Sequence, residues 1–233
     1  MTRDRLSVLM PCYNEEATLA EIAERVLASD PGVPMELVIV DDCSADGSVV
    51  IAERLAAEDP RIRLVKHEQN RGKGAAVRTA IAAATGTVAV IQDADFEYDP
   101  NDYGRLIAPI LAGKTDVVYG SRFLAGTPQG ALPSSVFANK ALTFWSNLVN
   151  GLRLTDMETC YKAIRTDLLK SLRLTSDRFG IEPEITARLA RAGAKITEVP
   201  ISYYPRSYDQ GKKINWRDGA AALWHILRFR FQR

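Results

Sequence analysis

Short apolar runs recur along the first half of the chain at nearly even spacing, and a polar segment follows each of them. Because the runs are continuous rather than alternating, they are typical of strands that are buried on both faces. Five strands are predicted in this way: 6–10 (LSVLM), 36–40 (ELVIV), 62–65 (IRLV), 88–91 (VAVI) and 116–119 (DVVY).

Helical patterns fill the segments between these strands, with apolar residues three or four positions apart on one face of each predicted helix. These residues are Leu19, Ile22, Val26 and Leu27 in the first helix, Val49, Ala52 and Leu55 in the second, and Ala76, Ala80 and Ala84 in the third. Buried strands that alternate with amphipathic helices predict an α/β, Rossmann-like fold with a mostly parallel central sheet and helices on both faces.

The second half of the chain has a less regular pattern. We predict a loop at 124–136, helices at 139–151 and 184–192, a strand at 195–199 and an amphipathic helix at 216–231. Residues 1–215 are predicted to form one domain, which a C-terminal helical segment (216–233) follows. Ligands of parallel sheets bind beyond the carboxyl ends of the strands. The loops after residues 10, 40, 91 and 119 are therefore the candidate site.

Composition and charge exclude several classes of protein. Hydrophobic residues make up 46% of the 233 positions and charged residues 25%, as in ordinary soluble proteins. We expect neither a signal peptide nor a membrane span, because the N-terminal apolar run is too short for the first and no run reaches the roughly 18 apolar residues that the second needs. The net charge of +1 selects no polyanionic partner, so nucleic acid is not expected as a ligand. Three cysteines without metal-binding spacing suit a reducing compartment, and we expect a cytoplasmic protein.

An acidic motif, Gln92-Asp93-Ala94-Asp95-Phe96-Glu97, directly follows the predicted strand at 88–91. Carboxylates at alternate positions repel one another unless a cation or a donor lies between them. Mg²⁺ and Mn²⁺ prefer hard oxygen ligands and are usually held by one or two carboxylates together with substrate phosphates. Asp93, Asp95 and Glu97 are therefore candidate metal ligands; the alternative is a solvated turn whose acids cap the next helix.

Two other loops carry candidate ligand-binding residues. Asp41-Asp42 ends a strand, where a carboxylate can bind ribose hydroxyls or a base edge, although Ser44 or Asp46 of the same loop would serve equally as a helix N-cap. Asn70-Arg71-Gly72-Lys73-Gly74 precedes a helix whose backbone N–H groups, with Lys73, are suited to phosphate. That segment matches neither the P-loop nor the dinucleotide-binding fingerprint, which argues against an ATPase or an NAD-dependent dehydrogenase.

Taken together and in order, these loops match a known family. The chain resembles family 2 glycosyltransferases of the GT-A fold, and within them the branch of dolichol-phosphate mannose synthases and polyprenyl-phosphate glycosyltransferases. The resemblance covers about 6–216 and is carried by P-x-Y-N-E at 11–15, D-D-x-S-x-D-G-S at 41–48, N-x-G-K-G at 70–74, D-A-D-x-E at 93–97, G-S-R at 120–122, D-M-E-T-C-Y-K at 156–162, F-G-I-E-P-E at 179–184 and E-V-P-I-S-Y at 198–203. Each motif is weak alone, whereas the ordered set is highly specific.

The resemblance implies a role for each motif. The donor-binding residues of a nucleotide-sugar enzyme are implied to be Pro11, Tyr13, Glu15, Asp42, Lys73 and Asp93. The implied ligands of a Mg²⁺ or Mn²⁺ ion on the donor diphosphate are Asp93, Asp95 and Glu97. The residues implied to meet phosphates of donor or acceptor are Arg122, Arg206 and Lys213. An acid near the sugar is implied at Glu184 or Glu182, while Arg122 and Asp156 have the alternatives of a simple ion pair and a turn cap.

The expected reaction moves a hexose from a donor of the GDP-mannose or UDP-glucose type to polyprenyl phosphate, with the inversion that the family implies. The metal and cationic side chains would stabilise the departing diphosphate. A phosphate acceptor is mostly dianionic at neutral pH and needs no general base. The alternative acceptor is a hydroxyl of a saccharide or small metabolite, which needs a base, and Glu184 and Asp156 are candidates for it.

The C-terminal segment is basic and aromatic, since residues 206–233 hold seven Lys/Arg and two Asp. Such a helix suits an anionic membrane surface. Its predicted apolar face comprises Trp216, Ala220, Leu223, Trp224, Leu227 and Phe231. That face lies either on the inner face of the membrane, as in a peripheral protein, or on the protein core. The segment 136–152, with several aromatic residues, is a second candidate for membrane contact.

Two departures from the family weaken the lipid-acceptor prediction without affecting the donor prediction. Many relatives carry an Arg where this chain has Leu132-Pro133-Ser134-Ser135, and many have C-terminal transmembrane helices that this sequence lacks. The other rival classes are a nucleotide-sugar-binding protein without turnover and a nucleotidyltransferase, whose glycine-rich basic signature is missing. The sequence leaves open whether the chain works as a monomer, a homo-oligomer or with a separate membrane partner.

Overall fold

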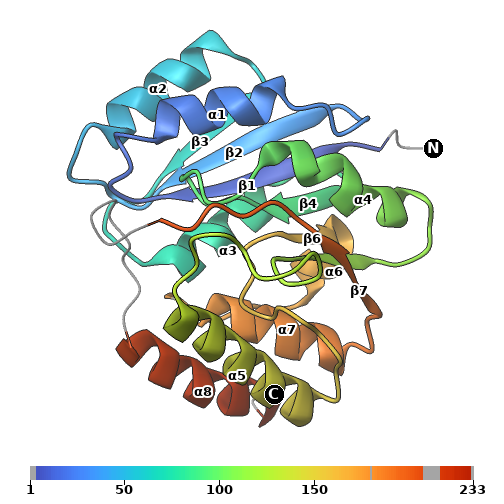
Figure 1. The fold of residues 1–233 in the computed structure, drawn as a ribbon. Helices are drawn as coiled ribbons and strands as arrows, with labels where there is room; N and C mark the ends of the chain where they lie inside the picture. Colours follow the sequence, from blue (N-terminus) through green and yellow to red (C-terminus); the bar gives the residue numbers. More distant parts are fainter. Residues whose placement is uncertain (1–3, 179, 207–215, 232–233) are drawn as a thin grey trace.

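A seven-stranded sheet runs through the centre of the molecule (Figure 1). The computed structural model describes residues 4–178, 180–206 and 216–231, with side chains of the last segment described from residue 221 onward. The strands are β1 (Leu6–Cys12), β2 (Met35–Asp41), β3 (Ile62–Lys66), β4 (Val88–Ile91), β5 (Val117–Ser121), β6 (Lys162–Arg165) and β7 (Ile196–Pro200). Their order in the sheet is β3-β2-β1-β4-β6-β5-β7, and β6 is antiparallel to both of its neighbours whereas the other pairs are parallel.

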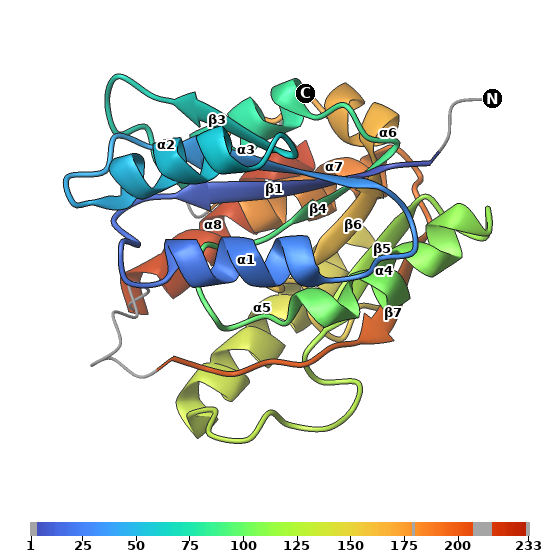
Figure 2. The same cartoon turned by 90° about the horizontal axis from the view of Figure 1, so that it is seen from above.

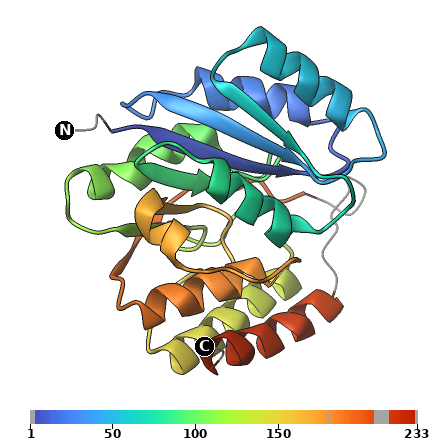
Figure 3. The same ribbon diagram turned by 180° about the vertical axis from the view of Figure 1, so that it is seen from behind.

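Helices cover both faces of this sheet, which confirms the predicted fold class. They are α1 (Leu19–Ala28), α2 (Ser48–Glu58), α3 (Lys73–Ala83), α4 (Tyr103–Leu111), α5 (Pro133–Asn150), α6 (Thr166–Ser171), α7 (Ile181–Arg191) and α8 (Trp216–Phe231), with a 3₁₀ turn η1 (Pro100–Asp102) before α4. Helices α1 and α2 pack together on one side, whereas α5, α7 and α8 pack on one another on the opposite side (Figures 1 and 3). In the described ranges, no helix is long and apolar enough to cross a membrane.

The continuous apolar runs correspond to the most deeply buried strands. Every residue of β1 and of β2 is buried, because helices lie on both faces of the sheet at this point. Burial on both faces removes the alternation that a half-exposed strand would show. The five strands predicted for the first half therefore lie within a residue or two of their predicted positions.

The second half needs several corrections. Helix α5 begins at Pro133 rather than at 139, because Pro133 occupies the first helical turn, where a missing N–H costs nothing. Helix α7 begins at Ile181 rather than 184. The strand β6 and the helix α6 were not predicted. With only four residues, the sequence Lys-Ala-Ile-Arg of β6 is too short to show a period.

The strand order predicts a ligand-binding crevice at the carboxyl edge. The chain passes from β1 to β2 and β3 on one side, and then returns to place β4 on the other side of β1. The loops after β1 and β4 therefore diverge at a topological switch point, where open α/β sheets bind their ligands. Seen from above, the segment that follows β7 runs back between α1 and α5 toward this edge (Figure 2).

Candidate active site

The loops after β1 and β2 are tied together by reciprocal hydrogen bonds. The backbone N–H of Asn14 donates to Ser44 Oγ at 3.0 Å, and the N–H of Ala45 donates to Asn14 Oδ1 at 2.8 Å. The N–H of Gly47 donates to Glu16 Oε2 at 2.7 Å. Asn14 has a φ of 53°, a left-handed conformation that Asn tolerates better than most residues. These polar residues of the first two motifs therefore fix the shape of the loops.

The predicted nucleoside-binding residues of the first loop come just before and just after Asn14 in the chain. Pro11 is buried within β1, Tyr13 is half-exposed just beyond the strand, and Glu15 extends toward Arg206, with 3.5 Å between Oε2 and Nη1. Tyr13 therefore offers an aromatic face at the edge of the crevice, and Glu15 contributes negative charge to its interior.

Asp42 is buried and already holds the loop at 70–72. Its Oδ2 accepts the N–H of Gly72 at 2.7 Å, while Oδ1 accepts the N–H of Arg71 at 2.9 Å and lies 2.6 Å from Nδ1 of His67. The geometry thus gives Asp42 a positioning role, since it joins the ends of β2 and β3 to the start of α3. Direct contact of Asp42 with a nucleoside stays a prediction.

The glycines before α3 serve close packing. A Cβ on Gly72 would lie 2.4 Å from the carbonyl oxygen of Asp177, and one on Gly74 would lie 2.3 Å from that of Ser176. The N–H of Ala75, in the first turn of α3, donates to the same Asp177 carbonyl at 3.1 Å. The N–H of Ala75 is therefore already paired, phosphate binding by this turn stays a prediction, and Lys73 is the cation of the segment that reaches the acidic motif.

Lys73 joins the acidic motif to α7. Its Nζ lies 2.8 Å from Asp93 Oδ1 and 3.0 Å from Glu182 Oε1. Burial opposes the charge of Lys73, but the two carboxylates outweigh it and raise the pKa of Lys73 well above its usual value. Burial likewise acts to raise the pKa of Asp93, yet the neighbouring ammonium holds that pKa below its usual value. Both groups therefore carry charge at neutral pH.

Arg206 meets the other two acids of the motif. Its Nη2 lies 2.5 Å from Asp95 Oδ2, and its backbone N–H donates to Glu97 Oε1 at 3.0 Å. The second oxygen of Glu97 accepts the hydroxyl of Tyr203 at 3.1 Å. Burial, and next the charge of Asp93, raise the pKa of Asp95 to about 7. The cluster is thus short of positive charge even with Arg206 in place.

The contacts of the acidic motif determine which of its carboxylates are available to a metal ion. In the part of the chain that the structure describes, no group of three or more His, Cys, Asp or Glu side chains is arranged to hold a metal ion. Asp93 and Asp95 nevertheless fit the kind of Mg²⁺ or Mn²⁺ site that one or two carboxylates form with substrate phosphates. Asp95 Oδ2 already binds a cationic group. A metal-binding role for Glu97 stays a prediction, because both of its oxygens accept hydrogen bonds from the segment after β7.

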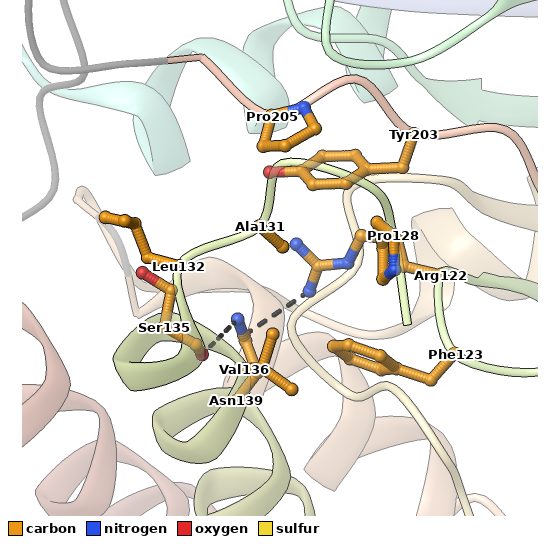
Figure 4. A pocket seen from close by; sticks show the side chains of 10 residues that line it. All are labelled: Arg122, Phe123, Pro128, Ala131, Leu132, Ser135, Val136, Asn139, Tyr203 and Pro205. Atoms are coloured by element: carbon orange, nitrogen blue, oxygen red, sulfur yellow. Dashed lines mark hydrogen bonds between the residues drawn. The ribbon is translucent and has the colours of Figure 1, made fainter. Parts of the chain in front are cut away.

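Arg122 and Asp156 form a buried bidentate ion pair beside a small cavity. Arg122 Nε and Nη2 each lie 2.7 Å from one oxygen of Asp156, whose carboxylate also accepts the Arg122 N–H at 3.0 Å. The guanidinium reaches toward Asn139 and lies 5.0 Å from the ring centre of Tyr203 (Figure 4). The cavity measures about 50 Å³ and is lined by Arg122, Phe123, Pro128, Ala131, Leu132, Ser135, Val136, Asn139, Tyr203 and Pro205.

The carboxylate of Glu184 already accepts hydrogen bonds from the segment before α7. It is fully buried and accepts the N–H groups of Thr175 and Ser176 at 2.9 and 2.7 Å, so it braces the segment that packs on α3. Of the two acids suggested by the resemblance, Glu182 is the one that contacts Lys73, a predicted donor-binding residue. Lys213, predicted to bind phosphate, lies outside the described residues.

Glu158 is an acid that sequence reasoning missed. Its Oε1 is buried and has no hydrogen-bond partner among the described residues. Burial, and next the charge of Glu182, raise the pKa of Glu158 to about 7. Its place in D-M-E-T-C-Y-K, two residues after Asp156, was the available signal, but only the structure shows that one oxygen of this carboxylate has no partner among the described residues.

The fold and the acidic site at its carboxyl edge define the class, an α/β glycosyltransferase of the GT-A type. A model of the family described as Glycosyl transferase family 2 matches residues 7–173. The chain therefore belongs to glycosyltransferase family 2.

Known relatives cover nearly the whole chain. It is 30% identical to the undecaprenyl-phosphate mannosyltransferase of Micrococcus luteus, over 97% of this chain and 98% of that protein. It is also 30% identical to the polyprenol monophosphomannose synthase of Mycolicibacterium smegmatis, over 89% and 80% of the two chains. The fold matches glucosyl-3-phosphoglycerate synthase from Mycobacterium tuberculosis, in complex with Mn²⁺, uridine-diphosphate and glucosyl-3-phosphoglycerate. The TM-score is 0.72 at 21% identity, over 98% of this chain and 80% of that chain.

Proposed function

We propose that this glycosyltransferase moves a hexosyl group from a nucleoside diphosphate sugar to a polyprenyl phosphate, with inversion and with Mg²⁺ or Mn²⁺. The names of the two 30% identical relatives support a polyprenyl phosphate acceptor. The complex of the structural neighbour with uridine-diphosphate and Mn²⁺ supports the donor class and the metal. Asp93 and Asp95 would hold the metal, which when bound supplies positive charge to the departing diphosphate.

One observation supports the choice of acceptor: the two candidate bases are already held by an ion pair or by hydrogen bonds. A hydroxyl acceptor must lose a proton to a base, and the sequence offers Asp156 and Glu184 for this task. Asp156 is paired bidentately with Arg122, and Glu184 accepts two backbone N–H groups. A phosphate monoester needs no base, because its second pKa of about 6 leaves it mostly dianionic at neutral pH.

In the proposed reaction, the positively charged residues act at different phosphates. Lys73, held between Asp93 and Glu182, provides a fixed cation beside the donor diphosphate. Arg122 faces the cavity and provides a second cation, which would screen the repulsion between acceptor phosphate and donor. Asp156 fixes the plane of that guanidinium, and a preoriented cation stabilises developing charge without the cost of reorganisation. Tyr13 would stack on the nucleobase at the edge of the crevice.

The acceptor also explains the exposed apolar side chains on α5 and α8, which we infer contact the membrane. Phe137, Phe144 and Leu148 lie seven and four residues apart on one face of α5, and they are 76%, 68% and 65% exposed. Trp224 and Phe231 of the adjacent α8 are 63% and 79% exposed. Apolar and aromatic side chains beside arginines suit an anionic bilayer surface. We therefore propose that the protein associates peripherally with the membrane.

The C-terminal helix uses two different stripes. Ala222, Ile226 and Phe229 are buried where α8 packs on α5 and α7, a stripe that the sequence prediction had not selected. From the predicted apolar face, Leu223, Trp224 and Phe231 are exposed. The helix therefore docks on neighbouring helices with one stripe and leaves the other for the membrane that we propose.

The test is transfer from radiolabelled GDP-mannose and UDP-glucose, each with Mg²⁺ or Mn²⁺, to prenyl phosphate in anionic liposomes or to soluble saccharides. We expect label in the solvent-extractable lipid and an inverted anomeric configuration by NMR. Glu158→Gln provides a second arm: lipid transfer should persist, whereas loss of a general base typically costs 10²–10⁴-fold. Efficient transfer to a soluble saccharide with none to prenyl phosphate would overturn the proposal.

A further inference from the structure

The segment after β7 is strapped across the acidic motif by Glu97. Tyr203 forms an isolated β-bridge with Tyr98, and the N–H of Tyr204 donates to the Glu97 carbonyl at 2.8 Å. The Glu97 carboxylate adds two more bonds, from the Tyr203 hydroxyl and the Arg206 N–H. Residues 203–206, here called the strap, are thus held mainly through one residue of the motif.

The guanidinium of Arg206 lies among three carboxylates that come from two loops. It pairs with Asp95 at 2.5 Å, with Glu15 at 3.5 Å and with Glu97 at 3.9 Å. Its side chain is 19% exposed, and its buried Nε has no hydrogen-bond partner among the described residues. Arg206 therefore supplies positive charge to the motif but leaves one buried N–H without a hydrogen bond, which costs free energy. A metal ion at the same carboxylates would not carry that cost.

The same strap covers the cavity of Arg122. Tyr203 and Pro205 line that cavity on the side opposite α5, with the Tyr203 ring over the Arg122 guanidinium (Figure 4). The residues that hold the acidic motif and those that close the cavity are consecutive. A shift of Arg206 away from Asp95 must therefore be felt at Pro205 and Tyr203.

We propose that Arg206 and the divalent metal compete for Asp95 and Glu97, and that displacement of Arg206 lifts the strap from the Arg122 cavity. The inference rests on the proposed function and gives it an order: donor with metal binds first, and the acceptor phosphate enters second. Asp95 Oδ2 already holds Nη2 of Arg206 at 2.5 Å, and a second cation at the same oxygen would be repelled by the guanidinium, so metal binding there disfavours the pair with Arg206. By thermodynamic linkage, the strap weakens metal binding by the same factor by which the metal weakens the strap.

The first test is calorimetric titration of Mn²⁺ into the full chain with excess GDP or UDP. Arg206→Met removes the competing charge and keeps most of the apolar stem, and we expect Mn²⁺ affinity to rise about tenfold. Tyr203→Phe removes one bond from the strap and should raise Mn²⁺ affinity by about two- to fivefold. The controls are Arg61→Met, which removes an exposed ion pair with Asp59 just before β3, and Tyr204→Phe, which alters an exposed ring of the strap.

Equal or weaker Mn²⁺ affinity in Arg206→Met, with binding intact in the wild type, would overturn the strap proposal and leave the proposed function standing. No binding of either Mn²⁺ or Mg²⁺ by any of the proteins would exclude the metal, and with it both proposals.

The second readout is hydrogen exchange, which needs no turnover. The amides of Tyr204 and Arg206 both donate to Glu97. Adding Mn²⁺ with nucleotide should speed their exchange at least severalfold, because those bonds break when the strap lifts. The amide of Val118, in the middle of β5, is the internal control and should not change. Greater protection at Tyr204 and Arg206 would contradict the proposal.

Discussion

Asp42, Asp156 and Glu184 are carboxylates whose roles depend on what they contact rather than on their place in a motif. Each is buried and accepts at least two hydrogen bonds from its surroundings. Leaving a buried donor unsatisfied costs roughly 1–3 kcal/mol. Such residues can be essential without touching substrate, because they fix the loops and the cation that do.

Asp95 differs from these carboxylates because its partner is a cation that can leave. Asp95→Asn keeps an oxygen to accept the N–H of Glu97, so the loop should hold its shape. Without the charge, we expect turnover to fall at least about 100-fold, or about 3 kcal/mol of transition-state stabilisation.

Turnover over a Mn²⁺ titration, together with the circular dichroism of the variant, checks this prediction. The matched control is Asp99→Asn, just beyond the motif, which should remain within about twofold of the wild type. Full turnover of the wild type in excess EDTA would show that Asp95 does not act through a metal.

At the scale of elements, the sequence predicts what is set locally and misses what is set by contacts across the fold. The strands β1 and β2 are visible because apolar runs such as ELVIV are buried on both faces. The strand β6 is not, since Lys162 and Arg165 enclose only two apolar residues and its position depends on β4 and β5. Like β1 and β2, the acids of the site are set locally, because their spacing in the sequence was enough to find them.

Which of those acids is already hydrogen-bonded depends on residues far apart in the chain. Glu184 is held by Thr175 and Asp42 by Gly72, and no local spacing indicates either pairing. Glu158 was missed for the same reason, because the sequence does not show that its Oε1 has no hydrogen-bond partner among the described residues.

The junction between α3 and the segment at 176–178 provides a prediction at this scale. Gly74→Ala places a methyl group 2.3 Å from a backbone carbonyl, so one of the two segments must move. We expect the free energy of unfolding to fall by about 1–3 kcal/mol, the usual cost of overpacking. Urea denaturation measures this loss.

Gly104→Ala is the matched control, since its Cβ would meet only a carbonyl oxygen at 3.8 Å. Within α4 it should be neutral or stabilise by up to about 1 kcal/mol. Equal stability of the two variants would show that the junction is not tightly packed.

At the scale of the whole molecule, the proposed membrane face can be separated from the fold. Deleting the end of α8 is a poor test, because Ile226 and Phe229 are buried and their loss would disturb α5 and α7. Replacing the exposed pair, Phe144→Ser with Trp224→Ser, should lower binding to phosphatidylglycerol liposomes at least about tenfold. Each buried side chain of this size contributes roughly 1.5–3 kcal/mol.

Liposome flotation measures this binding, and thermal unfolding verifies the fold. Val50→Ser is the matched control, because Val50 is 65% exposed on α2, a helix on the opposite side of the molecule from α5 and α8 (Figure 1). Unchanged flotation of the double variant would exclude this face, and a wild-type dimer lost in the variant would assign it to a second copy of the chain.

The position of β6 also bears on how the protein is made. Strands β1 to β4 are neighbours in the sheet and are complete early in synthesis, whereas β5 leaves the ribosome before β6, the strand that must separate it from β4. At 5–20 residues per second, β4 keeps an open edge and β5 lacks its sheet neighbours for several seconds. The loops after β1, β2 and β4 can therefore form on the nascent chain, while the pair Arg122–Asp156 must wait until the loop before β6 arrives. Glu182 and Arg206, the partners of Lys73 and Asp95, are made later still, so the acidic motif keeps an incomplete set of ion pairs until the end of synthesis.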